Sequence, residues 1–265
     1  MTIRTISLRL CACAAGLALT ILARAAEPVV IIGDDDYAPY SYVEAGHFKG
    51  MYVDILTEAG RRLAPDYAIT LQPLPWKRGL LGMEAGTAFA LFPPGLKAER
   101  DYIQPYSVPL YRETVVLFCN SETMQVPRKS FPDDFVGLRI GVNLGFLLSE
   151  RLMQAAKQGL VKLDAVKGND SNLKKLALNR INCYASDRTA ALYSMKRLHA
   201  YFSNSSFSLQ ETVELSGENT YIGYSARNNP AYKADFIKKM NLVLETMRAN
   251  GDIARIESNY LPASR

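Results

Sequence analysis

The segment VVIIGDDD, residues 29–36, decides how the chain begins to fold. Its first four residues are apolar and β-branched, and Gly33 with the aspartates after it forms a polar turn. A short apolar run that ends in such a turn is typical of a buried β-strand. The chain therefore begins its folded part with a strand.

A helix follows this strand, and the alternation then continues along the chain. Apolar side chains recur every fourth residue on one face and stop before a proline, at Met51, Ile55, Ala59 and Leu63. Further strands are expected at 69–74, 89–92 and 114–119, with a helix around 80–84. A second series predicts strands at 138–142 and 181–185 and helices at 147–156, 172–178 and 189–198. The end of the chain predicts a helix with Ile237, Met240, Leu244 and Met247 on one face, and then a last short helix capped by Asp252 that carries Ile253, Ile256 and Tyr260. Alternating strands and helices predict α/β layers.

The first residues have the composition of a secretory signal peptide. Arg4 and Arg9 precede an apolar run at 10–22, which ends in Ala23-Arg24-Ala25. A charged start, a short apolar core and small residues at the cut define such signals, so we expect residues 1–25 to be removed before Ala26. The run is too short for a transmembrane helix, which predicts that the rest of the chain is exported.

Composition and charge argue against several function classes. The chain has 48% hydrophobic residues, enough for a sizeable core, and a net charge of +5, part of which is lost with the signal arginines. We expect no nucleic-acid partner, because no basic segment stands out. His47 and His199 are isolated, and no sequence motif of a catalytic or phosphate-binding site occurs, so we expect no metal, cofactor or catalytic residue.

Two cysteines remain after the signal. Cys119 and Cys183 each lie in a short strand-like run. In an oxidising compartment they could form a disulfide, and two unpaired thiols are the alternative. The residues alone leave both open.

Motifs in a fixed order connect the chain to a known family. The sequence contains, in this order, DDDYAPYSY, GMYVDIL, AERDYIQPYS, NRINCYASD and RANGDIARI. In this order they resemble the family 3 bacterial extracellular solute-binding proteins, which serve polar amino-acid ABC transporters. The resemblance covers nearly the whole chain after the signal. It implies a periplasmic monomer that captures a small polar solute, an amino acid or a related carboxylate, for a membrane ABC permease.

The resemblance also implies an architecture. Such proteins have the α/β fold of a two-lobed periplasmic binding protein (type II), a clamp with the ligand cleft between its lobes. Lobe 1 would combine residues 26–111 with 222–265, and lobe 2 would be 112–221. Crossing strands near 106–114 and 220–225 would form the hinge.

Two charged residues match the family's ligand anchors. Arg100 stands where the family arginine grips the ligand carboxylate, a task that suits the rigid guanidinium fork. Its alternative is an exposed ion pair with Glu99 or Asp101. Asp187 stands where an aspartate takes the ligand ammonium. Its alternative, compatible with that role, is to cap the helix expected at 189–198.

The remaining site residues are also carried over from the resemblance. Tyr37 and Trp76 match the stretches in which the family has aromatic side chains that hold the ligand's side chain. A lone tryptophan is also typical of a core. Asp34 matches a position facing the ligand side chain, and its alternative is a solvated turn. Two family loops are altered here. The segments around Gly95 and at Gly145-Phe146 lack the Thr or Ser that the family has there. A backbone N–H at Gly145-Phe146 could still bind an anion.

Two other functions share this fold. The fold resembles that of a periplasmic dehydratase, so one alternative is a lyase that acts on a small acid. The other alternative is a ligand-binding partner of a membrane sensor. Turnover of a cyclic hydroxy acid would favour the first, and a neighbouring sensor kinase gene the second.

Overall fold

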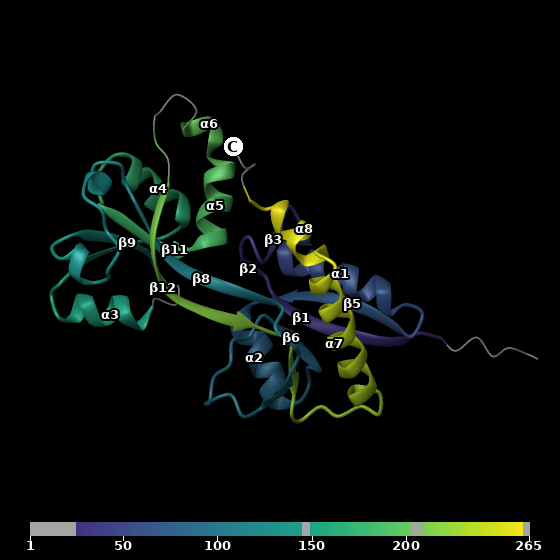
Figure 1. Ribbon diagram of the computed structural model, residues 1–265. Coiled ribbons are helices and arrows are strands. Elements are labelled where there is room, and N and C mark those ends of the chain that lie inside the picture. The colour runs from purple at the N-terminus through teal and green to yellow at the C-terminus, as the bar shows by residue number, and fades with distance from the viewer. Residues whose placement is uncertain (1–24, 145–148, 203–206, 208, 262–265) are drawn as a thin grey trace, which may run out of the picture.

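The computed structural model describes residues 25–144, 149–202, 207 and 209–261, and the expected signal peptide lies almost entirely outside them. Two lobes lie side by side, each with helices packed on a sheet (Figure 1). The first lobe contains helices α1 (Met51–Leu63), α2 (Trp76–Ala85), α7 (Lys233–Ala249) and α8 (Asp252–Ser258). The second contains α3 (Glu150–Lys157), α4 (Asn169–Ala177), α5 (Arg188–Arg197), α6 (His199–Phe202) and the 3₁₀ turns Thr123–Gln125 and Asp133–Phe135.

Each lobe is built on a five-stranded sheet. The first sheet has the order β5-β1-β6-β13-β7, with β5 (Tyr67–Leu74), β1 (Glu27–Asp34), β6 (Ala90–Phe92), β13 (Gly223–Ser225) and β7 (Ile103–Tyr106). The second has the order β10-β9-β11-β8-β12, with β10 (Lys162–Val166), β9 (Arg139–Asn143), β11 (Cys183–Asp187), β8 (Tyr111–Cys119) and β12 (Gln210–Thr220). A small third sheet joins β2 (Asp36–Tyr37), β3 (Ser41–Glu44) and β4 (His47–Lys49). The predicted α/β class is confirmed.

Helix α1 forms where the apolar spacing predicts it, and its expected apolar face is fully buried apart from a small part of Leu63. Gly50 precedes the helix with φ 129°, a conformation that favours glycine. A Cβ at this position would lie 2.4 Å from the Tyr40 carbonyl oxygen. Gly50 therefore brings the start of α1 against the segment that carries Tyr40.

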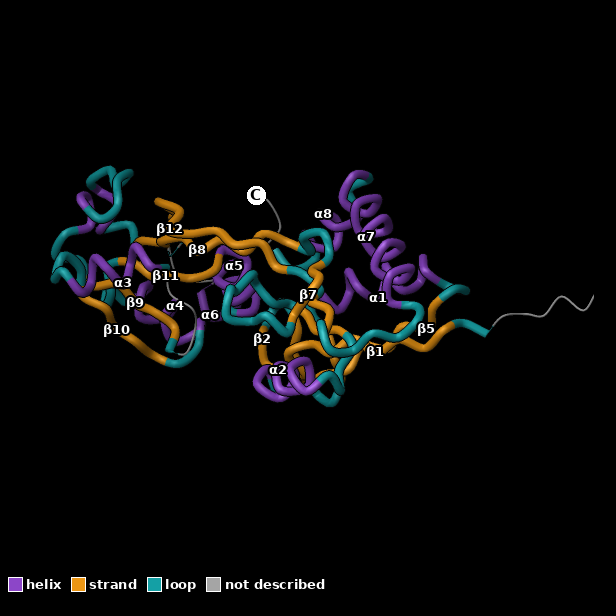
Figure 2. Tube along the Cα trace, turned by 90° about the horizontal axis from the view of Figure 1, so that it is seen from below, coloured by secondary structure: helices purple, strands orange, loops and turns teal. Residues whose placement is uncertain are grey.

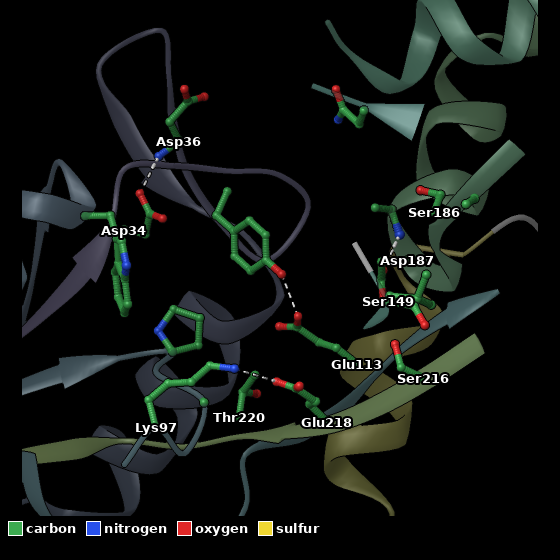
Figure 3. A pocket seen from close by; sticks show the side chains of 18 of the residues that line it. Asp34, Asp36, Lys97, Glu113, Ser149, Ser186, Asp187, Ser216, Glu218 and Thr220 are labelled. Carbon is green, nitrogen blue, oxygen red and sulfur yellow. Dashed lines mark hydrogen bonds and ion pairs between the residues drawn. The ribbon is translucent and has the colours of Figure 1, made fainter. Parts of the chain in front are cut away.

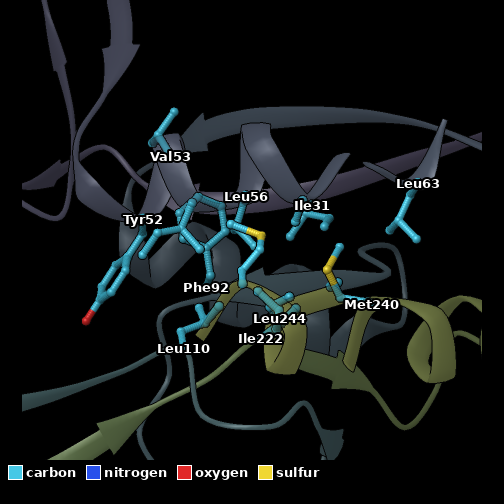
Figure 4. Close-up of a cluster of buried hydrophobic side chains, with 14 of the residues drawn as sticks. Ile31, Tyr52, Val53, Leu56, Leu63, Phe92, Leu110, Ile222, Met240 and Leu244 are labelled. Carbon is cyan, nitrogen blue, oxygen red and sulfur yellow. The ribbon is translucent and has the colours of Figure 1, made fainter. Parts of the chain in front are cut away.

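Apolar clusters cover both faces of the first sheet. One joins β1 and α1 to α7, and includes Ile31, Leu56, Phe92, Met240 and Leu244 (Figure 4). The other packs Met83 of α2 against Leu91 and Ile103. The segments before and after the second lobe thus share one core, because α7 returns to pack against α1.

A disulfide joins two neighbouring strands of the second sheet. Cys119 of β8 and Cys183 of β11 are directly opposite each other in an antiparallel pair, and their sulfurs are bonded. Both residues are fully buried in the cluster that packs α3 on this sheet. The structure therefore favours the disulfide over two free thiols.

The chain crosses between the two sheets twice. Strands β8 and β12 run together from the second lobe toward the first (Figure 2). At the crossing, the Leu110 N–H donates to the Thr220 carbonyl at 2.7 Å, and the Ser107 N–H donates to the Ile222 carbonyl at 2.9 Å. These paired crossing segments connect the two lobes.

Two features are missing from the described residues. No helix in this part of the chain has the length and apolar character needed to cross a membrane. Nor does this part contain three or more His, Cys, Asp or Glu side chains grouped so that they could hold a metal ion.

Candidate functional site

A cavity of about 970 Å³ lies between the two sheets, above the crossing strands. In Figure 3, Asp34 and Lys97 border it on the side of the first sheet, and Ser149, Ser186 and Asp187 border it on the side of the second. Glu113 and Glu218, from the crossing strands, lie between these sides. Both lobes and the crossing strands therefore contribute polar groups to one space.

The predicted site residues that the structure describes all line this cavity. They are Asp34, Tyr37, Trp76, Gly95, Arg100 and Asp187. Gly145 and Phe146 lie outside the described residues. The structure thus brings together side chains from β1, β2, α2, the loop before β7 and the end of β11.

Arg100 lies on the first-lobe side of the cavity. Its guanidinium carbon is 5.8 Å from the centre of the Trp76 ring, within the range of a cation–π contact. No carboxylate among the described residues, Glu99 and Asp101 included, lies within the 4.0 Å of an ion pair with it. The ion pair suggested as the alternative role of Arg100 is not formed, and the guanidinium fork is available to a ligand.

Trp76 lies both against the core and on the cavity. It is the first residue of α2 and partly buried against the cluster around Met83, and it also lines the cavity. The indole therefore rests on the core and offers a face to the Arg100 guanidinium.

Asp34 and Gly95 border the same side. The Asp34 carboxylate accepts a hydrogen bond of 3.2 Å from the Asp36 N–H, as expected of a turn, and partial burial raises its pKa. Near Gly95, Lys97 and Glu218 form an ion pair of 3.8 Å. Lys97 is thus already partnered, whereas Arg100 has no such carboxylate.

Asp187 caps α5, which was the alternative considered for it. Its Oδ1 accepts hydrogen bonds from the Ala190 N–H at 2.8 Å and from the Tyr40 hydroxyl at 2.5 Å, and its Oδ2 accepts one from the Thr114 N–H at 3.1 Å. Burial raises the pKa of Asp187, while these donors act in the opposite direction. Tyr40 belongs to the first lobe, so this carboxylate also connects the two lobes.

Asp187 lines the cavity and retains one acceptor position. A carboxylate has about four lone-pair directions, and three are used by the contacts above. One direction on Oδ2 remains for an ammonium. The two roles expected of Asp187 are therefore compatible.

Glu113 of β8 is a site residue that the sequence analysis did not identify. Its two oxygens accept hydrogen bonds from the hydroxyls of Tyr37 at 2.5 Å and Tyr52 at 2.6 Å. Burial, and then the charge of Asp187, raise the pKa of Glu113 to about 7, and the two tyrosine hydrogen bonds oppose this. Within the described part of the chain, no Lys, Arg or His lies at ion-pair distance from it.

The tyrosines behind these carboxylates form a buried layer. The Tyr40 and Tyr52 rings stack with centroids 4.9 Å apart, and Tyr37 lies 5.1 Å from Tyr40. Burial, followed by the nearby carboxylate charges, raises the pKa of Tyr37, Tyr40 and Tyr52 well above the usual value. They remain neutral hydroxyl donors at physiological pH.

Two sequence signals point to this arrangement. Glu113 is the acid in the otherwise β-rich run YRETVVLFC. Tyr52 stands in GMYVD where the family motif has an aspartate. The Tyr52 hydroxyl at this position donates to Glu113 of the crossing strand β8.

Comparisons with known proteins agree with the fold. The model of the bacterial extracellular solute-binding proteins, family 3, matches residues 29–263, and the chain belongs to this family. No curated protein sequence matches it significantly.

Solved structures share the whole architecture at low identity. The second substrate-binding domain of Lactococcus lactis GlnP, in an open conformation, has 17% identity and a TM-score of 0.70 over 90% of this chain and 97% of that chain. An ancestral amino-acid-binding protein described as a precursor of cyclohexadienyl dehydratase has 18% identity and a TM-score of 0.57 over 89% and 95%. A histidine kinase sensor domain similar to periplasmic binding proteins has 14% identity and a TM-score of 0.62 over 89% and 96%. The two-lobed periplasmic binding protein fold, type II, is thus established for this chain.

Proposed function

We propose that this protein captures a small polar solute, an amino acid or a related carboxylate, and presents it to a membrane ABC permease. The observation that carries the proposal is that Arg100 of the first lobe and Asp187 of the second line one cavity. A guanidinium without a carboxylate partner suits the solute carboxylate. The open acceptor position of Asp187 suits the solute ammonium.

The lobes have separate tasks in this proposal. Lobe 1 comprises residues 26–111 and 222–265, and lobe 2 residues 112–221. Trp76 and Tyr37 contribute aromatic surface beside the solute, and Asp34 and Gly95 border its side chain. A zwitterion that reaches both anchors has higher affinity for the closed clamp than for the open one, so binding favours closure.

The cellular context follows from the family and the N-terminus. We propose that the signal at 1–25 directs export, that the protein works in the periplasm, and that it does so as a monomer without a cofactor. Its partners are the solute and the permease.

A thermal-shift screen tests the proposal. A ligand that binds only the folded state, at 100 times its Kd, adds about 2.7 kcal/mol of stability. We expect at least one amino acid or small carboxylate to raise the melting temperature. A screen without any such ligand would contradict the proposal.

A lyase of the same fold is the second candidate, and Glu113 favours it. A carboxyl group with a pKa of about 7 inside the cavity holds a proton that it could donate to a leaving group. Incubation with cyclic hydroxy acids, followed by product analysis, separates the candidates. Turnover that is lost in Glu113→Gln would identify a lyase, whereas a solute recovered unchanged supports the binding protein.

A further inference from the structure

The charged side chains on the two sides of the cavity differ in sign and in their ion-pair partners. On the first-lobe side, Arg100 has no carboxylate partner among the residues that the structure describes, and Lys97 is paired with Glu218. On the hinge side lie Glu113 and Asp187, which we call the acidic pair. Neither member is within ion-pair distance of a Lys, Arg or His in the described part of the chain.

The acidic pair is held by neutral donors alone. Asp187 receives hydrogen bonds from one tyrosine hydroxyl and two backbone N–H groups, and Glu113 from two tyrosine hydroxyls. Placing two carboxylates together out of water, without a cation, is unfavourable. The fold therefore maintains a region that a positive group would stabilise.

Each carboxylate still has room for such a group. The tyrosine hydroxyls occupy one position on each oxygen of Glu113, and a carboxylate oxygen can accept two hydrogen bonds. Together with the free position on Asp187, the acidic pair offers several acceptors to donors in the cavity. When both carboxylates are ionised, one α-ammonium balances only one of their two negative charges.

We propose that the solute is an amino acid with a basic side chain, and that Glu113 binds the side-chain cation while Arg100 and Asp187 bind the α-carboxylate and α-ammonium. This inference rests on the proposed function, because it uses the same cavity. It adds the substrate class and assigns specificity to Glu113. Glutamate, glutamine and other solutes without a side-chain cation are poor ligands in this account.

The environment of Glu113 also predicts a dependence on pH. The titratable groups facing it are Tyr37 of β2, Tyr52 of α1, Asp187 of β11 and Glu218 of β12. The tyrosines stay neutral and the carboxylates repel a negative charge, so Glu113 keeps its proton more readily than usual. A cationic side chain binds the deprotonated form. Binding therefore releases protons near neutral pH, and affinity rises from about pH 6 to about pH 8.

Titration calorimetry with matched pairs of ligands tests the inference. L-Arginine is compared with L-citrulline, and L-lysine with L-norleucine, because each pair differs in the side-chain charge and little in shape. We expect the basic member of at least one pair to bind about 10-fold to 100-fold more tightly, in the range reported for close charge pairs at interfaces. We also expect Glu113→Gln to remove most of that preference.

Two controls keep the test decisive. Glu214→Gln, an exposed carboxylate of β12 outside the cavity and paired with Arg112, should leave the preference unchanged. If Glu113→Gln does not fold, wild-type protein titrated with L-arginine or L-lysine in two buffers of different ionisation enthalpy gives the proton release directly.

The outcomes separate the two proposals. Binding of uncharged or acidic amino acids with equal or higher affinity than basic ones would overturn this inference and leave the proposed function intact. Absence of binding by any amino acid or small carboxylate would overturn both.

Discussion

Arg100 and the acidic pair lie on two sides of one cavity, and they are supported in different ways. The Arg100 guanidinium rests over one indole ring and takes part in no ion pair among the described residues. Glu113 and Asp187 are instead held by the hydroxyls of Tyr37, Tyr40 and Tyr52 and by backbone N–H groups. Arg100 therefore contributes little to the stability of the fold, whereas the acidic pair also holds the lobes together. Substitutions on the two sides should therefore affect different properties.

The largest effect on binding is expected from Arg100→Ala. Loss of charge-assisted hydrogen bonds worth about 1.5–3 kcal/mol lowers affinity for the solute by about 10-fold to 150-fold. The melting temperature without ligand should barely change, since Arg100 forms no ion pair with a described residue. Calorimetry measures the first property and a melting curve the second.

Arg78→Ala is the matched control, because Arg78 is exposed and does not line the cavity. It should leave both properties unchanged. Unaltered affinity in Arg100→Ala would remove Arg100 from the site.

A change at Asp187 should lower stability even without solute. Asp187→Ala removes the cap of α5, worth about 0.5–2 kcal/mol, and leaves the Tyr40 hydroxyl and the Thr114 N–H without their acceptor. For a protein of this size, each kcal/mol lowers the melting temperature by about 2–4 °C. Differential scanning calorimetry checks this.

Asp187→Asn is the control, since its side-chain oxygen can still cap the helix. It should restore part of the stability. Equal melting temperatures for wild type and Asp187→Ala would mean that these contacts contribute nothing to the fold.

A further effect concerns Glu113 and appears as a dependence on pH. Its pKa of about 7 in the folded protein exceeds the ordinary value, so the folded state binds more protons than the unfolded state between these two values. Stability from this group is present at low pH and is lost as the pH rises through about 7. Compared with Glu113→Gln, the wild type should become progressively less stable between about pH 5 and about pH 8.

Melting curves of both proteins across this range provide the measurement. The difference between them isolates Glu113 from the other carboxylates. A constant difference would show that Glu113 titrates with an ordinary pKa and that the hinge side lacks the electrostatics described for it.

The sequence predicted the parts of the fold that depend on local patterns. Helix α1 follows the spacing of Met51, Ile55, Ala59 and Leu63, and the strands at 29–33 and 114–119 follow their apolar runs. The small sheet of β2, β3 and β4 and the long strand β12 were missed. In β12, polar residues alternate with few apolar ones, and its partner β8 is distant in sequence.

The residues of the cavity differ in the same way. Arg100 and Asp187 each lie in a motif that is readable along the chain, AERDYIQPYS and NRINCYASD. The surroundings of the acidic pair depend instead on contacts between residues that are far apart, such as Tyr40 with Asp187 and Tyr52 with Glu113. No local pattern encodes these contacts, because they arise only once both lobes and the crossing strands are in place.

The central claim is that one solute is held by both lobes, by Arg100 on one side and by Asp187 on the other. Small-angle scattering with and without saturating solute tests this most directly, because a solute that reaches both anchors favours the closed clamp. The account predicts a smaller radius of gyration with solute, and little contraction in Asp187→Ala even when the solute is bound. Equal contraction in wild type and Asp187→Ala would contradict it, since Asp187 would then be only the cap of α5 and another group would close the cleft.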